Sequence, residues 1–340
     1  MRWITLILIC AMASCSKPAG APKPPGKLID IGGRRLHLNC TGQGEPTVIL
    51  EAGAGGFSLE WALVQSEAAR FARVVSYDRA GYAWSDPGPT PRTMHQIAGE
   101  LHAALARAEI TPPYVLVGHS YGGLVVRTFA ELYPGDVVGM VLVDSSHEDA
   151  PITLTHRVTG EKKVFRMRDL SLGRWIPPVS LGPPPAPATA PSSQAATQPT
   201  ALEHPFDRIP RELHAARRWA TALPAYAATR EAEFDYWPEE AEHLASQRGP
   251  GQYPLGDRPL VVVTQGLHDF AQGVSDAARR QHRIDEHQQL QADLLTLSRN
   301  SKQIIATHSG HHVPLEEPQA VIDAIRQVVD SARRGEKLKP

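Results

Sequence analysis

Residues 114–130 read YVLVGHSYGGLVVRTFA: an apolar run leads into G-H-S-Y-G, and a second apolar run with helical spacing follows. The pattern G-x-S-x-G between a strand and a helix is typical of a sharp turn that exposes the central serine, Ser120. Because this turn brings strand and helix close together, Gly118 and Gly122 must lack side chains, and Gly123 allows close packing. The pattern predicts a strand–turn–helix unit that presents Ser120; the alternative is an ordinary glycine-rich turn.

Strands and helices alternate over most of the remaining chain. Two short strands are expected within 28–38, joined by a turn at Gly32-Gly33. Buried strands are expected at 47–51, 73–78, 137–143, 260–264 and 303–306, and helices at 94–109 and 321–329. This alternation predicts an α/β fold, in which a mostly parallel central sheet carries helices on both faces.

The alternation breaks between residues 146 and 257. Residues 177–201 are rich in Pro and Ala, which predicts a disordered loop. Helices are expected nearby, at 212–222 and 231–246, with several aromatic residues among them. We therefore expect a helical lid inserted before the penultimate strand, so that the chain divides into a core of 28–145 and 258–335 and a lid of 146–257.

The first residues resemble the signal peptide of a bacterial lipoprotein. The apolar run 3–9 is too short to span a bilayer. Residues 11–15, AMASC, resemble the lipobox, with methionine where leucine is commonest. The resemblance implies removal of residues 1–14, lipidation of Cys15 with palmitate-type chains, and a Pro-rich tether over 15–27. We expect an exported protein, lipid-anchored to a membrane of the cell envelope; the alternative is a plain secretory signal and a periplasmic or secreted protein.

Charge is nearly balanced, with 35 Lys and Arg residues against 36 Asp and Glu residues. Nucleic-acid binding therefore has no electrostatic support. No ligand spacing typical of a metal site is evident, so neither a metal nor a cofactor is expected. No oligomeric state is predicted.

Four segments, in this order, resemble the α/β-hydrolase superfamily, and the resemblance extends over roughly residues 28–330. They are VILEAGAGG at 48–56, VVSYDRAGYAWSD at 74–86, VLVGHSYGG at 115–123 and SGHHVPLEEPQAV at 309–321. The second departs from the superfamily's pattern, since Ala80 precedes its glycine and Ala83-Trp84 stands where a glycine is usual. The chain looks like a lidded serine hydrolase of the AB hydrolase-1 type.

The resemblance implies a nucleophile, a base and an acid in the chain order Ser, Asp, His. Ser120 is the expected nucleophile and His311 the expected base, with the adjacent His312 as the alternative. For the acid we favour Asp269, which lies in a G-x-x-D turn after the strand 260–264, over Asp144 at the end of the preceding strand.

Two backbone N–H groups are expected to form an oxyanion hole. By position these belong to Tyr121, directly after the nucleophile, and to Ala54, in the glycine loop after the strand 47–51.

The expected activity is hydrolysis of a small-molecule carboxylic ester through an acyl-enzyme. Cleavage of an amide, a peptide or a carbon–carbon bond by the same triad is the enzymatic alternative. Dehalogenases and epoxide hydrolases of this fold use an aspartate nucleophile, which Ser120 argues against. A non-catalytic ligand-binding member of the fold is the alternative of another class.

Overall fold

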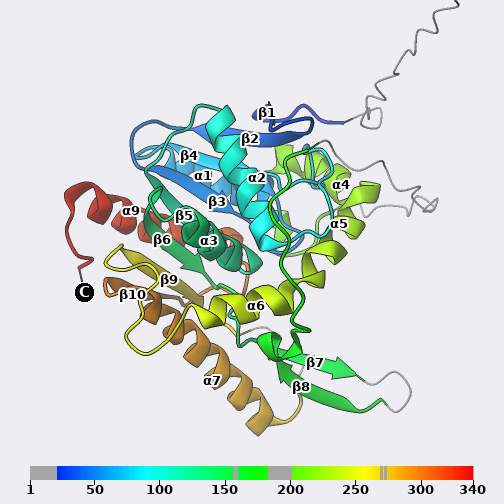
Figure 1. Ribbon diagram of the computed structural model, residues 1–340, viewed down its shortest axis with the longest axis vertical. Helices are drawn as coiled ribbons and strands as arrows, with labels where there is room; N and C mark the ends of the chain where they lie inside the picture. Colours follow the sequence, from blue (N-terminus) through cyan, green and yellow to red (C-terminus); the bar gives the residue numbers. More distant parts are fainter. Residues whose placement is uncertain (1–20, 156–159, 183–200, 269–270, 272–273, 340) are drawn as a thin grey trace, which may run out of the picture.

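An eight-stranded sheet forms the centre of the computed structural model, which describes residues 21–155, 160–182, 201–268, 271 and 274–339 (Figure 1). The strand order is β1-β2-β4-β3-β5-β6-β9-β10. The pairs β1–β2 and β2–β4 are antiparallel, and all other neighbours in this sheet are parallel. The strands are β1 (Lys27–Asp30), β2 (Arg35–Thr41), β3 (Thr47–Glu51), β4 (Val74–Tyr77), β5 (Tyr114–His119), β6 (Val137–Val143), β9 (Leu260–Gln265) and β10 (Ser301–Ala306). The α/β fold with a mostly parallel sheet is thus confirmed.

Helices cover both faces of the sheet (Figure 1). On one face the core includes α2 (Met94–Arg107) and α3 (Tyr121–Leu132); on the other it includes α1 (Ala62–Ala68) and α9 (Pro318–Arg334). Successive side chains of a strand point to opposite faces of the sheet, so each strand contributes to both cores. In β5, Leu116 belongs to the first core, and its neighbours Val115 and Val117 belong to the second. Buried on both faces, β5 ends at the turn that carries Ser120.

The segment between β6 and β9 contains a β-hairpin as well as helices. Its elements are β7 (Pro151–Thr155), β8 (Lys162–Arg166), α4 (His214–Thr221), α5 (Pro224–Asp235) and α6 (Trp237–Ser246). A helix was expected at 212–222 and is present, whereas the single helix expected at 231–246 is divided at Tyr236, and its first part begins at Pro224. The hairpin was not expected from the sequence. Its second strand is exposed along its whole length, so no apolar alternation marks it. Short 3₁₀ turns also occur in the described chain, at Ser58–Trp61, Met167–Leu170, Phe206–Arg208, Arg211–Leu213 and Leu294–Leu297.

The first part of the expected disordered loop is bound to the core. The carbonyl oxygen of Ser180 accepts hydrogen bonds from Arg34 and Gln96, at 2.6 and 2.7 Å. The Val179 side chain lies against Gly99 so closely that a Cβ there would be 2.4 Å from Val179 Cγ1. Residues 179–182 thus contact the core directly, because the buried side chains of Arg34 and Gln96 find hydrogen-bond partners there. Residues 183–200 lie outside the described part.

A long helix, α7 (Ala277–Asp293), forms most of the connection from β9 to β10. Its N-cap Asp276 accepts a hydrogen bond of 2.7 Å from the backbone N–H of Arg279. Only Gln291 is buried in this helix, so the apolar periodicity that marks most helices is missing. The short helix α8 (Val313–Glu316) then follows β10 and precedes α9.

The expected signal peptide and Cys15 lie outside the described residues. Within the part of the chain that is described, no helix has both the length and the apolar character needed to cross a membrane. The end of the expected tether contacts the core, since Trp84 Nε1 donates a hydrogen bond of 2.7 Å to the carbonyl oxygen of Pro22.

Candidate active site

The turn between β5 and α3 holds Ser120 in a strained backbone conformation. Its φ of 53° and ψ of −123° are rarely adopted by a residue with a side chain. A Cβ on Gly118 would lie 2.5 Å from the carbonyl oxygen of Gly122, and a Cβ on Gly123 would lie 1.9 Å from Ser145 Oγ. The glycines therefore have the steric reason expected from the sequence: they let the chain turn sharply enough to present Ser120.

Three side chains from separate loops form a hydrogen-bonded row. His311 Nε2 lies 2.9 Å from Ser120 Oγ, and His311 Nδ1 lies 2.6 Å from Asp144 Oδ2. Ser120 follows β5, Asp144 follows β6, and His311 follows β10, so all three lie beyond the carboxyl ends of parallel strands. This is the serine–histidine–carboxylate arrangement in which a base removes the hydroxyl proton.

The Asp144 carboxylate is buried and has further partners. Its Oδ1 accepts a hydrogen bond of 3.2 Å from the backbone N–H of Gln265 and lies 3.2 Å from Nε2 of His287. Burial by itself would raise the pKa of Asp144, but the hydrogen bonds from His287 and His311 outweigh it and lower the pKa. The Asp144 side chain is therefore stabilised as the ionised carboxylate.

In the described part of the chain, the carboxylate at hydrogen-bond distance from His311 is Asp144, the alternative acid of the sequence-based prediction. Asp269, which we favoured, lies outside the described residues. Of the two candidate bases, His311 has its ring nitrogen at the serine hydroxyl. The His312 ring instead packs edge-on against Phe206 of the lid segment, with ring centroids 5.0 Å apart.

His119, the residue before the serine, supports the loop of His311. Its Nε2 lies 2.8 Å from the backbone carbonyl oxygen of His311, which can only accept a hydrogen bond. Burial, together with the nearby His311 and His312, lowers the pKa of His119 well below its usual value. His119 is therefore neutral and carries its proton on Nε2.

The glycine loop after β3 lies directly against the serine. A Cβ on Gly53 would be 3.3 Å from Ser120 Cβ and 3.2 Å from His119 Nδ1. The buried guanidinium of Arg79 donates hydrogen bonds of 2.7 Å to the carbonyl oxygens of both Ala52 and Gly53. Because C=O and N–H point in opposite directions across a trans peptide, the N–H of Ala54 is directed away from Arg79.

Arg79 also joins this loop to the lid segment. Its Nε and Nη2 lie 2.7 and 3.2 Å from the carboxylate of Glu233 on α5, and its Nη1 lies 2.7 Å from Glu51. Tyr82 donates a further hydrogen bond of 2.8 Å to Glu233. All four side chains are buried, so the carboxylates and the guanidinium satisfy one another.

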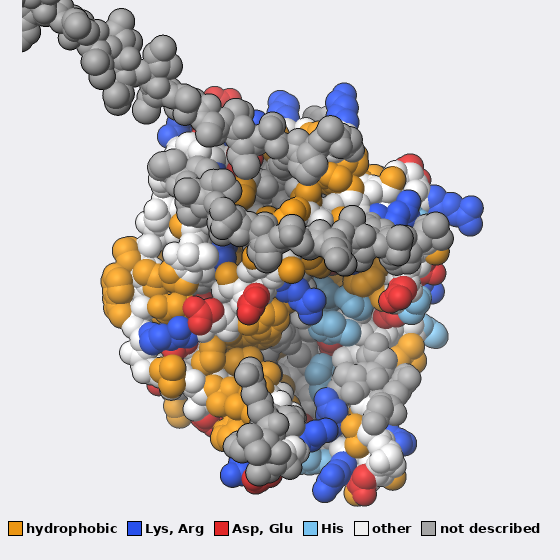
Figure 2. Space-filling model, turned by 90° about the vertical axis from the view of Figure 1, so that its right-hand side faces the viewer, with side chains coloured by type: hydrophobic (Ala, Val, Ile, Leu, Met, Phe, Trp, Pro, Cys, Tyr) orange, Lys and Arg blue, Asp and Glu red, His pale blue; other side chains and the backbone are white. Residues whose placement is uncertain are grey.

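A cavity of about 300 Å³ opens beside Asp144 and His311. Residues after β6 and the side chains of α7 line it, including Arg283, His287 and Leu290. Figure 2 shows the molecule from the side of the lid, and His side chains gather on this face. The cavity is large enough for a small organic group next to the hydrogen-bonded row.

His287 and Glu233 were not predicted from the sequence as parts of the site. His287 lies on α7, a helix without apolar periodicity, and no motif marks its approach to Asp144. Glu233 lies 154 positions from Arg79 in a lid helix, and only the folded chain brings the two together.

Two curated proteins are similar to this chain in sequence. A curated relative from Gibberella zeae, described as an AB hydrolase superfamily protein, is 26% identical over 311 residues, which are 85% of this chain and 88% of that one. A second, described as the probable transporter efuK of Hormonema carpetanum, is 38% identical over 129 residues; these are 36% of this chain and only 18% of that one.

Solved structures of hydrolases share the architecture. A thermophilic esterase from Thermogutta terrifontis superimposes with a TM-score of 0.56 at 18% identity, over 90% of this chain and 98% of that one. An epoxide hydrolase of Vigna radiata gives 0.59 at 14% identity, over 90% and 98%. The model of the alpha/beta hydrolase family matches residues 48–324, well over half of the chain. The chain therefore belongs to the alpha/beta hydrolase family.

Proposed function

We propose that this protein is a serine hydrolase that cleaves a carboxylic ester, with Ser120 as nucleophile, His311 as base and Asp144 as the acid. The observation that carries the proposal is the hydrogen-bonded row, with 2.9 Å between Ser120 Oγ and His311 Nε2 and 2.6 Å between His311 Nδ1 and Asp144 Oδ2. Those distances lie within the range expected of a nucleophile and its base.

In the proposed reaction, His311 Nε2 takes the Ser120 hydroxyl proton as Oγ forms a bond to the acyl carbon. The Asp144 carboxylate stabilises the imidazolium. The carbonyl oxygen becomes negatively charged and accepts hydrogen bonds from the backbone N–H groups of Tyr121 and Ala54. The imidazolium then protonates the leaving alkoxide, which leaves an ester between Ser120 and the acyl group. Water activated by His311 hydrolyses this ester and regenerates the hydroxyl.

The oxyanion hole draws support from the Arg79 contacts. By fixing the carbonyl oxygens of Ala52 and Gly53, Arg79 fixes the orientation of the next amide, that of Ala54. Such a donor must be positioned before the negative charge develops, because reorienting it during the reaction would cost free energy.

A serine nucleophile favours acyl transfer over epoxide opening, although epoxide hydrolases share the fold. In epoxide hydrolases of this fold the nucleophile is an aspartate, whereas the residue at the turn here is Ser120. Amide, peptide or carbon–carbon cleavage uses the same triad. Comparing p-nitrophenyl esters with p-nitroanilides of the same acyl group distinguishes ester from amide cleavage.

The test is the Ser120→Ala variant. We expect it to lose turnover of p-nitrophenyl esters and labelling by a fluorophosphonate probe, since the attacking oxygen is gone. Ser66→Ala, at an exposed serine of α1, is the matched control and should keep both. Undiminished turnover by a folded Ser120→Ala would refute the mechanism. A folded wild-type protein that neither reacts with the probe nor turns over any ester of a chain-length series would favour a ligand-binding role instead.

A further inference from the structure

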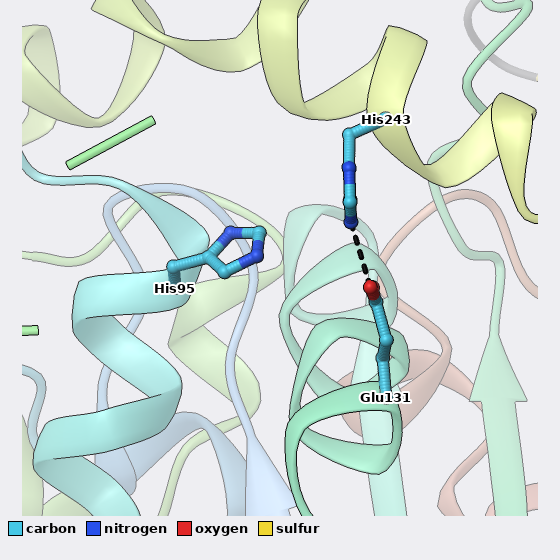
Figure 3. A group of neighbouring side chains, drawn as sticks. All are labelled: His95, Glu131 and His243. Carbon is cyan, nitrogen blue, oxygen red and sulfur yellow. Dashed lines mark hydrogen bonds and ion pairs between the residues drawn. The ribbon is translucent and has the colours of Figure 1, made fainter. Parts of the chain in front are cut away.

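A second cluster of ionisable side chains lies where α6 of the lid segment meets two core helices. Figure 3 shows His95 of α2, Glu131 of α3 and His243 of α6 directed toward one another. One ligand atom from each of the three side chains lies within 4.8 Å of the others. Two imidazoles and one carboxylate on three separate helices form a donor set typical of Zn²⁺.

The existing contacts already hold the three side chains of the cluster close together. His243 Nε2 lies 2.7 Å from Glu131 Oε1, and the ring centroids of His95 and His243 are 5.3 Å apart. The three side chains are 17–32% exposed, so an ion can reach them from solvent. Bonds to zinc of about 2.0–2.2 Å require donor atoms closer than 4.8 Å, so binding calls for rotation of these partly exposed side chains toward the ion.

Glu240 supplies the outer contact that metal-binding histidines commonly have. His95 Nδ1 lies 3.1 Å from Glu240 Oε1, and the same carboxylate accepts hydrogen bonds from the backbone N–H groups of Met94 and His95. Glu240 is buried, so its position is fixed by these contacts. When the carboxylate holds the proton on Nδ1 of His95, the lone pair on Nε2 can coordinate a metal.

The surroundings leave room for a water ligand. A hollow of about 710 Å³ adjoins His95 and His243. Arg174 also lines it, but its guanidinium is paired with Glu239 at 2.8 Å and with Asp235 at 3.1 Å. The positive charge of Arg174 is thus balanced by carboxylates of its own.

We propose that His95, Glu131 and His243 bind a divalent transition-metal cation of the zinc class, with water completing the coordination, and that the ion links α6 to α2 and α3. This site is separate from the hydrogen-bonded row at Ser120, and the proposal does not depend on ester hydrolysis. Its structural consequence is to fix α6, whose Trp237 packs edge-on against Tyr121, with ring centroids 5.3 Å apart.

The test is calorimetric titration of the full chain, freed of metal with EDTA and dialysed, with ZnCl₂. We expect His243→Ala and Glu131→Gln each to lose one bound equivalent, or to weaken it by on the order of tenfold or more. The matched control is His102→Gln, which removes another histidine–carboxylate pair of α2, with Asp136 at 3.1 Å, outside the cluster. It should bind as the wild type does.

Hydrogen exchange provides a second readout. Zn²⁺ should slow exchange of the backbone amides of residues 237–246 in the wild type and in His102→Gln, and leave them unchanged in the two ligand variants. Circular dichroism of the metal-free variants verifies that they are folded. If His243→Ala does not fold, Glu131→Gln tests the site by itself. The proposal is overturned if the wild type binds no Zn²⁺ at millimolar concentration, or if both folded ligand variants bind it as the wild type does.

Discussion

Asp144 is held more firmly than its role as a hydrogen-bond acceptor for His311 alone would require. One oxygen lies 2.6 Å from His311, while the other is fixed by the backbone of Gln265 and by His287. Its backbone φ of 39° is unusual for a residue with a side chain. Such strain and such a full set of partners at a buried carboxylate are typical of a functional site.

The Asp144→Asn variant should therefore reduce kcat by about 10⁴-fold, because the amide cannot stabilise a charged His311 and can hold the wrong tautomer. Asp269→Asn is the comparison and should reduce the rate far less. Steady-state hydrolysis of a p-nitrophenyl ester measures both, with thermal melts to verify folding. The opposite order of the two effects would assign the acid to Asp269.

At this scale the sequence was sufficient to single out Ser120 and His311, whose side chains lie 2.9 Å apart, because each residue lies in a motif with a local steric or spacing requirement. It was not sufficient to choose the acid, because Asp144 and Asp269 both follow parallel strands and a carboxylate after either strand can approach the histidine. That choice depends on loop conformation, which no short motif encodes.

At the scale of elements, α5 is fixed to the core by charge as well as by apolar packing. Glu233 is buried against Arg79 and Tyr82, and Arg79 in turn holds the loop of Gly53. One ion pair thus couples the position of a lid helix to the geometry beside Ser120.

The Glu233→Ala variant should lower the free energy of unfolding by about 3–5 kcal/mol, because it leaves the Nε and Nη2 groups of the buried Arg79 without the carboxylate that accepts their hydrogen bonds. Glu231→Ala, two residues earlier and exposed, is the matched control and should change it by less than about 0.5 kcal/mol. Urea unfolding measures both. Equal effects of the two substitutions would show that the ion pair contributes nothing particular to stability.

Elements were predictable where burial imposes a period. Strands such as β5 and β9 are buried along their length, and helices such as α9 carry an apolar stripe. The apolar pattern of their residues therefore predicts them. The exposed strand β8 and the polar helix α7 carry no such pattern, and both were missed. Their positions depend on tertiary contacts that a single sequence does not display.

For the molecule as a whole, two apolar cores on opposite faces of the sheet determine the architecture, while smaller apolar clusters and polar contacts attach the lid segment. One such cluster packs Phe57 and Trp84 of the core against Ala216 and Ala220 of α4. Because only the sheet cores generate long-range periodicity, the fold was predictable and the shape of the substrate site was not.

The placement of the whole molecule in the cell is a separate proposal, which rests on the sequence AMASC at 11–15. Acyl chains on Cys15 would hold the protein at a membrane without a spanning helix, since each buried CH₂ contributes about 0.8 kcal/mol. Expressed in a bacterium supplied with radiolabelled palmitate, the wild type should incorporate label and Cys15→Ser should not. Cys40→Ser, which removes the free thiol of β2, should still be labelled. An unlabelled wild type, or label retained by Cys15→Ser, would instead favour a plain secretory signal.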